Sequence, residues 1–517
     1  MKRAKILWAD DEIDLLKPYI LFLTGKGFEV VPVNNGRDAI ERCKEEHFDI
    51  IFLDEHMPGI SGLETLELLH NSHPEIPVVM ITKSEDEGIM EKAIGRKITD
   101  YLIKPVNPHQ ILMAVKKILD QKSLISATNI ESYREEFSQL SDRINNCTTA
   151  YDWAEMYKSL ALWDIEFAQS DNPMQEVLQM QHEEANSEFG KFIKHTYTKW
   201  FKEDAATDAP ILSHQLLKRF LLPLLDQKKK TFFILIDNFR YDQWLVIRDV
   251  ITEHFTYRED NYYSILPTAT QYARNALFAG MTPRDIAARM PELWVNDTDD
   301  EGKNEHEEQL LRHFMKSNGR NERFSYHKIN SNAAGEKVVS NFHQLEEFDL
   351  NVLVFNFIDI LSHMRSESKM IKELAPNESA YRSLTKSWFT HSPLAELLKT
   401  IAQQGHHVVL TSDHGTVRVK KPEKVIAEKQ INSNLRYKVG RHITYNSRKV
   451  FEVDQPQSVG LPSPNISSRY IFALRDEFFV YPNNFNQIGA TYNDTFQHGG
   501  VSMEEMIVPL ITLSPKQ

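Results

Sequence analysis

The stretch HHVVLTSDHG, from His406 to Gly415, decides the fold of the largest part of the chain. Its first half, His406–Leu410, has the apolar and β-branched composition of a short buried strand, so Asp413 and His414 follow the carboxyl end of that strand. Ligands of open α/β sheets gather at such strand ends. A carboxylate beside an imidazole is also an ordinary pair of zinc ligands. The stretch therefore predicts an α/β sheet with polar chemistry at one edge.

Two further apolar segments end in the same way. Thr231–Ile236 runs directly into Asp237, and Val352–Ile358 runs into Asp359. His363 follows Asp359 by four residues, a spacing that places two side chains on one face of a helical turn. Together with an imidazole near two glycines later in the chain, these strand ends favour a metal centre. The candidate ligands are Asp237, Asp359, His363, Asp413, His414 and His498.

The composition is that of a globular protein with several domains. Of 517 residues, 41% are hydrophobic and 26% are charged, and no apolar run reaches the roughly 18 residues of a membrane span. The residues after Met1 lead into a strand followed by acids, which is unlike a signal peptide. Two cysteines, Cys43 and Cys147, give no disulfide framework. We therefore expect a cytoplasmic protein, and the net charge of -13 argues against a general nucleic-acid binder.

The first part of the chain alternates short apolar strands with helical patterns. Strands are expected at Lys5–Ala9, Phe48–Leu53, Val78–Ile81 and Tyr101–Ile103. This alternation predicts a doubly wound parallel sheet with helices on both faces.

Each of these strands is followed by a residue with useful chemistry. Asp10 and Asp11 follow the first strand and Asp54 follows the second, which gives the oxygen-rich site that Mg²⁺ prefers. The tight turn after Asp54 leaves its carboxylate free to act as a nucleophile. Thr82, after the third strand, can hydrogen-bond a phosphoryl oxygen, and Lys104, after the fourth, can neutralise its charge.

With these residues in this order, residues 1–120 resemble a response-regulator receiver domain. The resemblance implies that Asp54 accepts a phosphoryl group from a cognate sensor histidine kinase. Lys83 stands where the family usually has a small residue. The implied Mg²⁺ ligands are Asp10, Asp11, Asp54 and the main-chain carbonyl of His56. The implied switch residues are Thr82, Tyr101 and Lys104.

The character of the sequence changes between residues 121 and 226. Glycine nearly vanishes, and apolar residues recur at helical spacing from Trp153 to Phe167. Pro223 should interrupt a helix. We expect an all-α helical connector over 121–226 whose apolar stripe packs within the chain. The alternative is that the stripe pairs with a second copy of the chain.

The segment ILPTAT, Ile265–Thr270, precedes a helical stretch through Arg274. A hydroxyl at a strand-to-helix turn can be a nucleophile, and the amides that begin the helix can cradle an anion. Taken alone, Thr270 is better explained as a helix N-cap. Beside a metal ion its hydroxyl would have a lowered pKa, so both interpretations stay open.

From residue 231 onward the chain resembles the PglZ branch of the alkaline phosphatase superfamily, and we place this α/β domain at 227–517. Pro267–Thr270 is also similar to the Pro-Thr-x-Thr segment of nucleotide phosphodiesterases, whose second Thr is the nucleophile. The resemblance therefore implies Thr270 as the nucleophile and two Zn²⁺ ions as cofactors. Arg274 is a candidate contact for a phosphate oxygen, or else a surface ion pair. One zinc would be held by Asp237, Thr270, Asp413 and His414, and the other by Asp359, His363 and His498.

The order of receiver, helical connector and PglZ-type domain resembles the response regulators of the type IX secretion system. It implies a zinc-dependent phosphodiesterase that acts on nucleotides or oligonucleotides and is controlled by phosphorylation. Implied partners are the kinase, secretion-system components or a sigma factor, and a second copy of the chain in a phosphorylation-promoted homodimer. No recognition-helix motif or basic face follows the receiver, so sequence-specific DNA binding is not expected.

Two other functions stay open. The chain could be an adaptor whose metal site is structural, or a phosphomonoesterase or phosphomutase, with Mn²⁺ in the mutase case. A basic region over residues 418–450 is either a solvated loop or a groove for oligonucleotide phosphates.

Overall fold

The chain folds into two compact units, Met1–Ser132 and Tyr133–Gln517. None of the described helices is both long and apolar enough to cross a membrane. Lys83 lies outside the described residues, as do residues 428–433 of the basic region. The computed structural model describes residues 4–73, 76–82, 98–168, 174–202, 209–296, 304–367, 373, 375–427, 434–463, 465 and 467–516.

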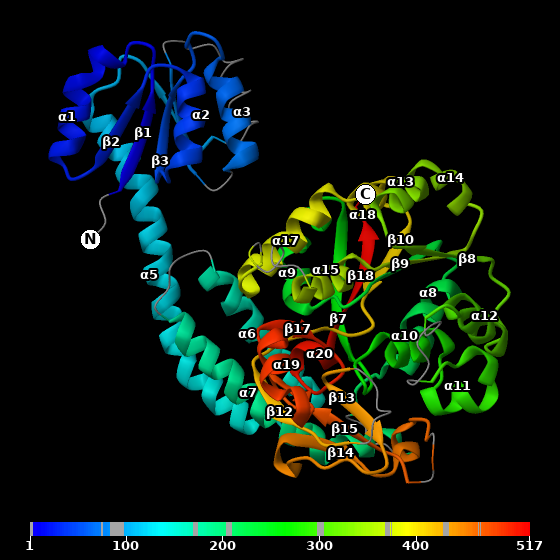
Figure 1. The fold of residues 1–517 in the computed structure, drawn as a ribbon. Coiled ribbons are helices and arrows are strands. Elements are labelled where there is room, and N and C mark those ends of the chain that lie inside the picture. The colour runs from blue at the N-terminus through cyan, green and yellow to red at the C-terminus, as the bar shows by residue number, and fades with distance from the viewer. Residues whose placement is uncertain are drawn as a thin grey trace. The chain divides into compact units, whose positions relative to one another are not determined.

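The N-terminal unit is a parallel sheet with helices on both faces (Figure 1). Its five strands lie in the order β2-β1-β3-β4-β5. Alternate residues of β1 face opposite sides: Leu7 packs with α2 and α3, and Trp8 packs with α1 and the start of α5. The doubly wound fold predicted for this region is confirmed. The elements are β1 (Lys5–Ala9), α1 (Lys17–Gly25), β2 (Glu29–Val33), α2 (Gly36–Glu45), β3 (Ile50–Asp54), α3 (Gly62–Ser72), β4 (Val78–Thr82), β5 (Asp100–Ile103) and α5 (Pro108–Asn146).

The sequence patterns missed strand β2. It lies at the edge of the sheet, pairs with β1 alone, and carries Pro32. Proline lacks an N–H and is tolerated at a sheet edge, so its presence hid a real strand. The second predicted strand also begins two residues later than expected, at Ile50, and it includes Asp54 as its last residue.

The C-terminal unit is built on a six-stranded mixed sheet in the order β7-β18-β10-β6-β9-β8. Strands β10, β6, β9 and β8 are parallel, whereas β18 is antiparallel to both of its neighbours. Leu410, Ile234 and Leu353 are in register across the three central strands, so the residues that follow these strands reach the same edge. The strands are β6 (Thr231–Ile236), β7 (Phe255–Tyr263), β8 (Phe324–Ile329), β9 (Leu350–Phe355), β10 (His407–Thr411) and β18 (Ile507–Pro515).

Helices cover both faces of this sheet (Figure 1). Phe233 of β6 meets Phe278 of α10 on one face, and its neighbour Phe232 meets Phe342 of α14 on the other. Strand β9 ends at Phe355, earlier than the predicted Ile358, because Phe357 already begins helix α15. The covering helices are α9 (Tyr241–Thr252), α10 (Thr270–Ala279), α12 (Glu307–Ser317), α13 (Asn332–Ser340), α14 (Phe342–Leu345), α15 (Phe357–Glu367), α17 (Glu378–His391) and α18 (Pro393–Gln403).

The helical connector shares one hydrophobic core with this sheet. Its apolar stripe lies on α6 (Ala150–Ala168), where Trp153 and Tyr157 are buried and Tyr157 packs against Tyr241 of α9. The alternative that this stripe pairs with a second chain is wrong, because the stripe is already buried within its own chain. The connector continues through α7 (Gln175–Thr196) to a π-helical turn at Leu217–Leu221 and then α8 (Leu222–Asp226), which has Pro223 in its first turn.

A group of small sheets, coloured orange to red in Figure 1, completes the C-terminal unit. They pair β11 with β17, β12 with β16, and β15 with both β13 and β14. Two short helices, α19 and α20, accompany them. These elements are β11 (Val417–Val419), β12 (Lys421–Lys424), β13 (Tyr437–Gly440), β14 (Val450–Val453), β15 (Arg469–Ala473), β16 (Glu477–Val480), α19 (Phe485–Tyr492), β17 (Thr495–Gln497) and α20 (Met503–Met506).

Candidate metal centres

Three carboxylates of the N-terminal unit meet at the carboxyl edge of its sheet. Asp10 and Asp11 follow β1 and Asp54 ends β3, and each offers an oxygen within 4.8 Å of the others. The Lys104 ammonium, directly after β5, lies 2.7 Å from Asp10 Oδ2 and 3.2 Å from Asp54 Oδ2. One cation thus faces three acids, which leaves negative charge for a divalent cation to balance.

The environment of Asp54 fits a bound cation. Its side chain is buried, and its Oδ1 has no hydrogen-bond partner among the described residues. Burial raises the pKa of Asp54 to about 6, against the opposing effect of Lys104. A buried oxygen without a donor and a set of hard oxygen atoms suit Mg²⁺. The other residues predicted here lie nearby along the chain: Thr82 ends β4, Tyr101 is half-buried in β5, and His56 is exposed in the loop after β3.

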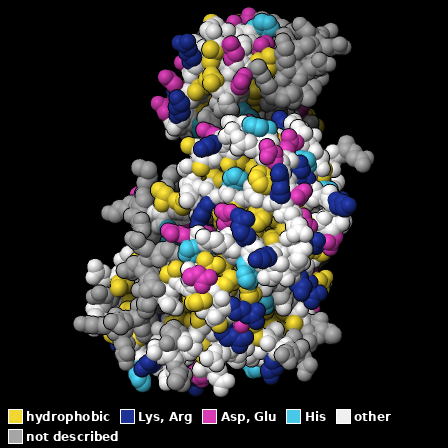
Figure 2. Space-filling view, turned by 90° about the vertical axis from the view of Figure 1, so that its right-hand side faces the viewer, with side chains coloured by type: hydrophobic (Ala, Val, Ile, Leu, Met, Phe, Trp, Pro, Cys, Tyr) yellow, Lys and Arg dark blue, Asp and Glu magenta, His cyan; other side chains and the backbone are white. Residues whose placement is uncertain are grey.

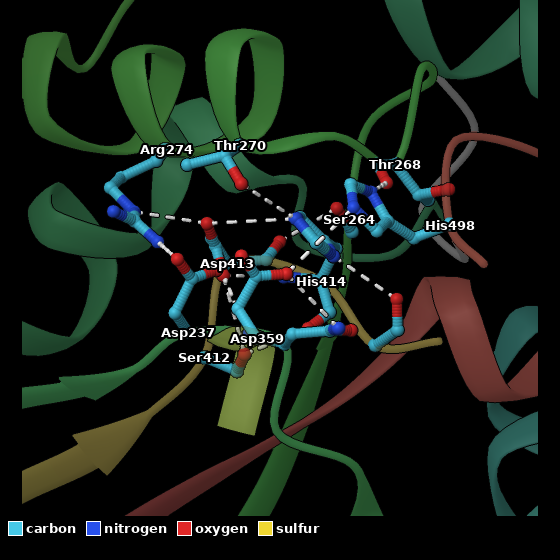
Figure 3. A network of polar contacts seen from close by, with 12 residues as sticks. Asp237, Ser264, Thr268, Thr270, Arg274, Asp359, Ser412, Asp413, His414 and His498 are labelled. Atoms are coloured by element: carbon cyan, nitrogen blue, oxygen red, sulfur yellow. Dashed lines mark hydrogen bonds and ion pairs between the residues drawn. The ribbon is translucent and has the colours of Figure 1, made fainter. Parts of the chain in front are cut away.

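The six candidate zinc ligands form two clusters at the carboxyl edge of the larger sheet. Figure 3 labels Asp237, Asp359, Asp413, His414 and His498 among them. Within each cluster the ligand atoms lie within 4.8 Å of one another. The ligands come from the loops after β6, β10 and β17 and from the first turns of α15. The first centre contains Asp237, Asp413 and His414, and the second centre contains Asp359, His363 and His498.

The tautomers of two histidines leave their Nε2 atoms unprotonated. His414 Nδ1 lies 3.0 Å from the Gly415 carbonyl oxygen, and His498 Nδ1 lies 3.1 Å from that of Thr268. A carbonyl oxygen only accepts hydrogen bonds, so each Nδ1 carries the proton and each Nε2 offers a lone pair. Burial, helped by the neighbouring His414, lowers the pKa of His498 to about 3, so this ring is neutral, as a metal ligand must be.

Arg274 is buried beside the first centre and does not lie at the surface. Its Nε donates to Asp413 Oδ2 at 3.0 Å, and its guanidinium also pairs with Asp237 and lies 3.5 Å from Glu307. It is 1% exposed, so the predicted alternative of a surface ion pair is wrong. Because its donors face protein carboxylates, Arg274 aligns two candidate ligands, as Figure 3 shows.

Thr270 is the first residue of α10, and Ala269 is the N-cap residue of that helix. The interpretation of Thr270 as a helix cap is therefore wrong. Its Oγ1 lies 3.2 Å from His414 Nε2. The hydroxyl thus faces the first centre at the start of a helix, where main-chain amides favour negative charge.

Helix α20 fixes the two loops that carry His414 and His498. Glu505 accepts a hydrogen bond from Gly500 N–H at 2.9 Å, and its carbonyl accepts one from Gly415 N–H at 3.1 Å. A β-carbon on Gly415 would lie 2.0 Å from the Glu504 carbonyl oxygen, so a side chain does not fit there. Sequence reasoning missed Glu505, because its partners Gly415 and Arg436 lie far from it in the chain.

Thr268 was visible in the sequence as part of ILPTAT, but its role was not. Its hydroxyl accepts from Gly499 N–H at 3.0 Å and donates to the Gly500 carbonyl at 2.9 Å. Its own carbonyl orients His498, as described above. Thr268 therefore holds the loop that delivers a ligand to the second centre.

The basic region is neither a simple loop nor an uninterrupted basic surface. It contains β12 and β13, and the side chains of Arg436 and Lys438 are buried. Arg436 pairs with Glu505, and Arg418 pairs with Asp494. On the face that Figure 2 shows, Lys and Arg side chains are interspersed with acidic and apolar ones. Several basic residues predicted to meet phosphates are thus engaged within the protein.

The donor set of the two centres fits zinc. Asp237 Oδ1 is buried and has no hydrogen-bond partner among the described residues. Burial raises the pKa of Asp237 well above its usual range, with Asp413 and Asp359 adding to the rise and Arg274 opposing it. Zinc at the first centre would add to the positive charge that Arg274 alone supplies to Asp237 and Asp413, and carboxylate oxygens with imidazole nitrogens are its ordinary ligands.

Three protein-family models match consecutive parts of the chain. The response regulator receiver domain matches residues 6–116, and the PorX response regulator linker domain matches residues 123–201. The BREX system PglZ alkaline phosphatase-like domain matches residues 216–513, which is more than half of the 517 residues.

Similar proteins match through the receiver region. The transcriptional regulatory protein ZraR of Klebsiella oxytoca is 28% identical over 141 residues, 27% of this chain and 32% of that protein. The alkaline phosphatase synthesis transcriptional regulatory protein PhoP of Bacillus subtilis is 30% identical over 134 residues, 26% of this chain and 55% of that protein. The structure of Vibrio cholerae chemotaxis protein CheY4 is 27% identical and covers 23% of this chain and 99% of its own, with a TM-score of 0.22. The chain thus spans about a third to a half of the curated relatives it matches.

The first of the three family models thus describes a response regulator receiver domain, and the last describes an alkaline phosphatase-like domain. The chain belongs to the family of BREX system PglZ alkaline phosphatase-like domains, and its order of receiver, PorX linker and PglZ domain matches a PorX-type architecture.

Proposed function

We propose that this protein is a response regulator whose output is a zinc-dependent phosphodiesterase acting on nucleotides or oligonucleotides. The observation that supports it best is the position of Thr270. Its hydroxyl lies 3.2 Å from Nε2 of a candidate zinc ligand, at the beginning of a helix. A purely structural metal site would need no hydroxyl at that place. The similarity of Pro267–Thr270 to the nucleotide phosphodiesterases supports a diester substrate.

In this proposal Thr270 Oγ1 is the nucleophile. It loses its proton and bonds to phosphorus while the bond from phosphorus to the departing ester oxygen breaks and that oxygen gains a proton. The N-terminal amides of α10 favour the negative charge that develops. Water then hydrolyses the phosphothreonine ester and restores the hydroxyl.

The protein would hold one zinc ion with Asp237, Asp413, His414 and the Thr270 oxygen, and the other with Asp359, His363 and His498. Zinc ions bound there would supply the charge that stabilises the attacking and departing oxygens of the displacement. Arg274 keeps Asp237 and Asp413 aligned. Glu505 and Thr268 keep the two histidine-bearing loops in place.

We propose Asp54 as the phosphorylation site of the receiver, with Mg²⁺ held by Asp10, Asp11, Asp54 and the His56 carbonyl. Lys104 and Thr82 would contact the phosphoryl oxygens, and Tyr101 would respond to them. A phosphorylation-promoted homodimer and a part in type IX secretion, through secretion components or a sigma factor, rest on the PorX-type architecture.

The test is hydrolysis of nucleotide diesters and monoesters by the zinc-loaded full chain, with Thr270→Ala measured beside it. We expect diester cleavage by the wild type and its loss in Thr270→Ala at unchanged zinc content. Cleavage of monoesters alone would replace the proposal with a phosphomonoesterase. No cleavage of either class by protein that holds zinc would favour the adaptor.

A further inference from the structure

Asn238, directly after Asp237, contacts ligand residues of both candidate metal centres. Its main-chain N–H donates to Asp413 Oδ1 of the first centre at 3.3 Å. Its side-chain Nδ2 donates to Asp359 Oδ1 of the second centre, also at 3.3 Å. Asn238 thus lies between two carboxylates that come from different elements.

The orientation of the Asn238 carboxamide is fixed by its neighbours. Asp359 Oδ1 is a carboxylate oxygen and accepts. Ser362 Oγ gives its own proton to the Asp359 carbonyl at 2.8 Å, so it accepts from Nδ2 at 3.1 Å. Both groups therefore require the amide nitrogen on their side, and the amide oxygen faces elsewhere.

The Asn238 amide oxygen suits a position beside a bound water or ion. Asn238 is fully buried, and its Oδ1 has no hydrogen-bond partner among the described residues. A buried amide oxygen without a partner costs free energy, so a water or an ion is expected beside it. The need is the same as that of the unpartnered Asp237 Oδ1 in the adjacent residue.

The backbone at Asn238 also explains the residue type. Its φ is +63°, in the left-handed region, which asparagine tolerates better than most residues with a side chain. Glycine would tolerate this conformation equally well but would supply no donor to Asp359. Asparagine meets both requirements.

We propose that Asn238 is a positioning residue that ties the carboxylates of the two centres together and so sets the separation of their metal ions. The inference rests on the proposed function, since it concerns the zinc centres of that phosphodiesterase. In-line displacement between two metals requires them to be about 4 Å apart, so a residue that holds one ligand of each has a direct effect on the chemistry. The carboxamide would act on the second centre, and the backbone N–H on the first.

Asn238→Gly separates these two actions, because glycine keeps the left-handed backbone and the N–H but removes the carboxamide. The full chain is titrated with Zn²⁺ against a competing chelator, and the two binding steps are assigned with Asp413→Ala and Asp359→Ala. We expect the second centre to weaken by about 10–100-fold and the first to stay unchanged, as is usual when a ligand loses its outer partner. In parallel, Mn²⁺-loaded protein should show altered spin coupling between its two ions.

Ser362→Ala is the matched control, since it removes the other partner of Nδ2 and leaves the bond to Asp359. We expect it to weaken the second centre less than Asn238→Gly does, because the bond from Nδ2 to Asp359 remains. Unchanged affinities and coupling in Asn238→Gly, an equal weakening of both centres, or an equal loss in Ser362→Ala would each overturn the proposal. Wild-type protein that binds no zinc would instead refute the phosphodiesterase itself, and this proposal with it.

Discussion

The imidazole rings of His414 and His498 stack with centroids 4.3 Å apart and planes 19° apart. One ring belongs to the first centre and the other to the second. Because both rings donate through Nδ1 to main-chain carbonyls, their Nε2 atoms carry no proton and belong to neighbouring clusters. The two clusters therefore lie side by side, divided by a pair of stacked rings, an arrangement that suits two neighbouring metal ions.

Zinc content should divide between the two clusters. We expect about two zinc ions per chain, with Asp413→Ala losing the ion of the first centre and Asp359→Ala that of the second. Elemental analysis of protein purified without added metal measures this. Asp260→Ala, at a partly exposed site on β7, is the control and should keep both ions. An Asp413→Ala variant that retained the full zinc content would contradict the assignment.

The methyl group of Thr270 should contribute far less to catalysis than its hydroxyl. Thr270→Ala should lower kcat/KM for a nucleotide diester by at least about a thousandfold, as is usual for loss of a nucleophile. Thr270→Ser should keep a measurable share of the activity. Steady-state rates at equal zinc content measure both. Near-normal turnover by the alanine variant would mean that water attacks phosphorus directly.

Arg274 should contribute most to the free energy of unfolding when no metal is bound. Arg274→Gln leaves Asp237 and Asp413 buried without their cation, which should lower the free energy of unfolding by about 3–5 kcal/mol in EDTA. Zinc restores positive charge beside these carboxylates, so Arg274→Gln should lower the free energy of unfolding by less when zinc is bound. Urea unfolding in EDTA and in zinc measures the difference. Arg258→Gln, in an exposed ion pair with Asp260, should cost no more than about 1 kcal/mol in either condition.

The pair formed by the buried His182 and the half-buried Asp164 should make stability depend on pH. Burial alone would lower the pKa of His182, but the Asp164 carboxylate, 3.0 Å away, raises it to about 9 from an ordinary 6.5. The folded state then binds more protons than the unfolded state between those values, so stability is full below pH 6.5 and falls as pH rises towards 9. The fall should be roughly 3 kcal/mol.

Urea unfolding at a series of pH values tests this. His182→Gln should remove most of the decrease in the free energy of unfolding between pH 6.5 and 9. His195→Gln, at an exposed position in the last turn of the same helix, should leave it unchanged. The same slope in all three proteins would show that other groups cause it.

Phosphorylation of Asp54 should shift a monomer–dimer equilibrium, since a phosphoryl group can act only by stabilising one of two states. Light scattering of the full chain with and without beryllofluoride measures the mass. We expect a larger mass with beryllofluoride in the wild type and no change in Asp54→Ala. An unchanged mass in the wild type would leave the receiver with a role in partner recognition alone.

The sequence was informative where one local pattern decided the structure. Strand β6 and the acid after it follow from a continuous apolar run, and α6 follows from its stripe. The end of β9 did not follow, because Phe357 and Ile358 continue the apolar run into a helix, and Ile358 in its first turn is also buried. Composition cannot mark a boundary between two buried elements.

The surroundings of the site were harder to predict than its ligands. Strand-end acids and imidazoles are visible in the sequence because parallel strands bring their ends together. Whether Arg274 meets solvent or two carboxylates depends on Asp237, 37 residues before it, and on Asp413, 139 residues after it, and no local pattern reports that. Asn238 was overlooked for the same reason, although it stands next to a predicted ligand.

The place of β18 in the large sheet has a consequence for synthesis on the ribosome. Strand β7 joins the sheet through β18 alone, and β18 is made after every other strand of that sheet. The segment after β7 carries Thr268 and Thr270, so its connection to the sheet through β7 forms only after β18 has emerged. The receiver, whose strands are translated first, can fold long before then. On the proposed function, a chain still being translated would therefore have a receiver able to accept a phosphoryl group but no completed hydrolase for it to control.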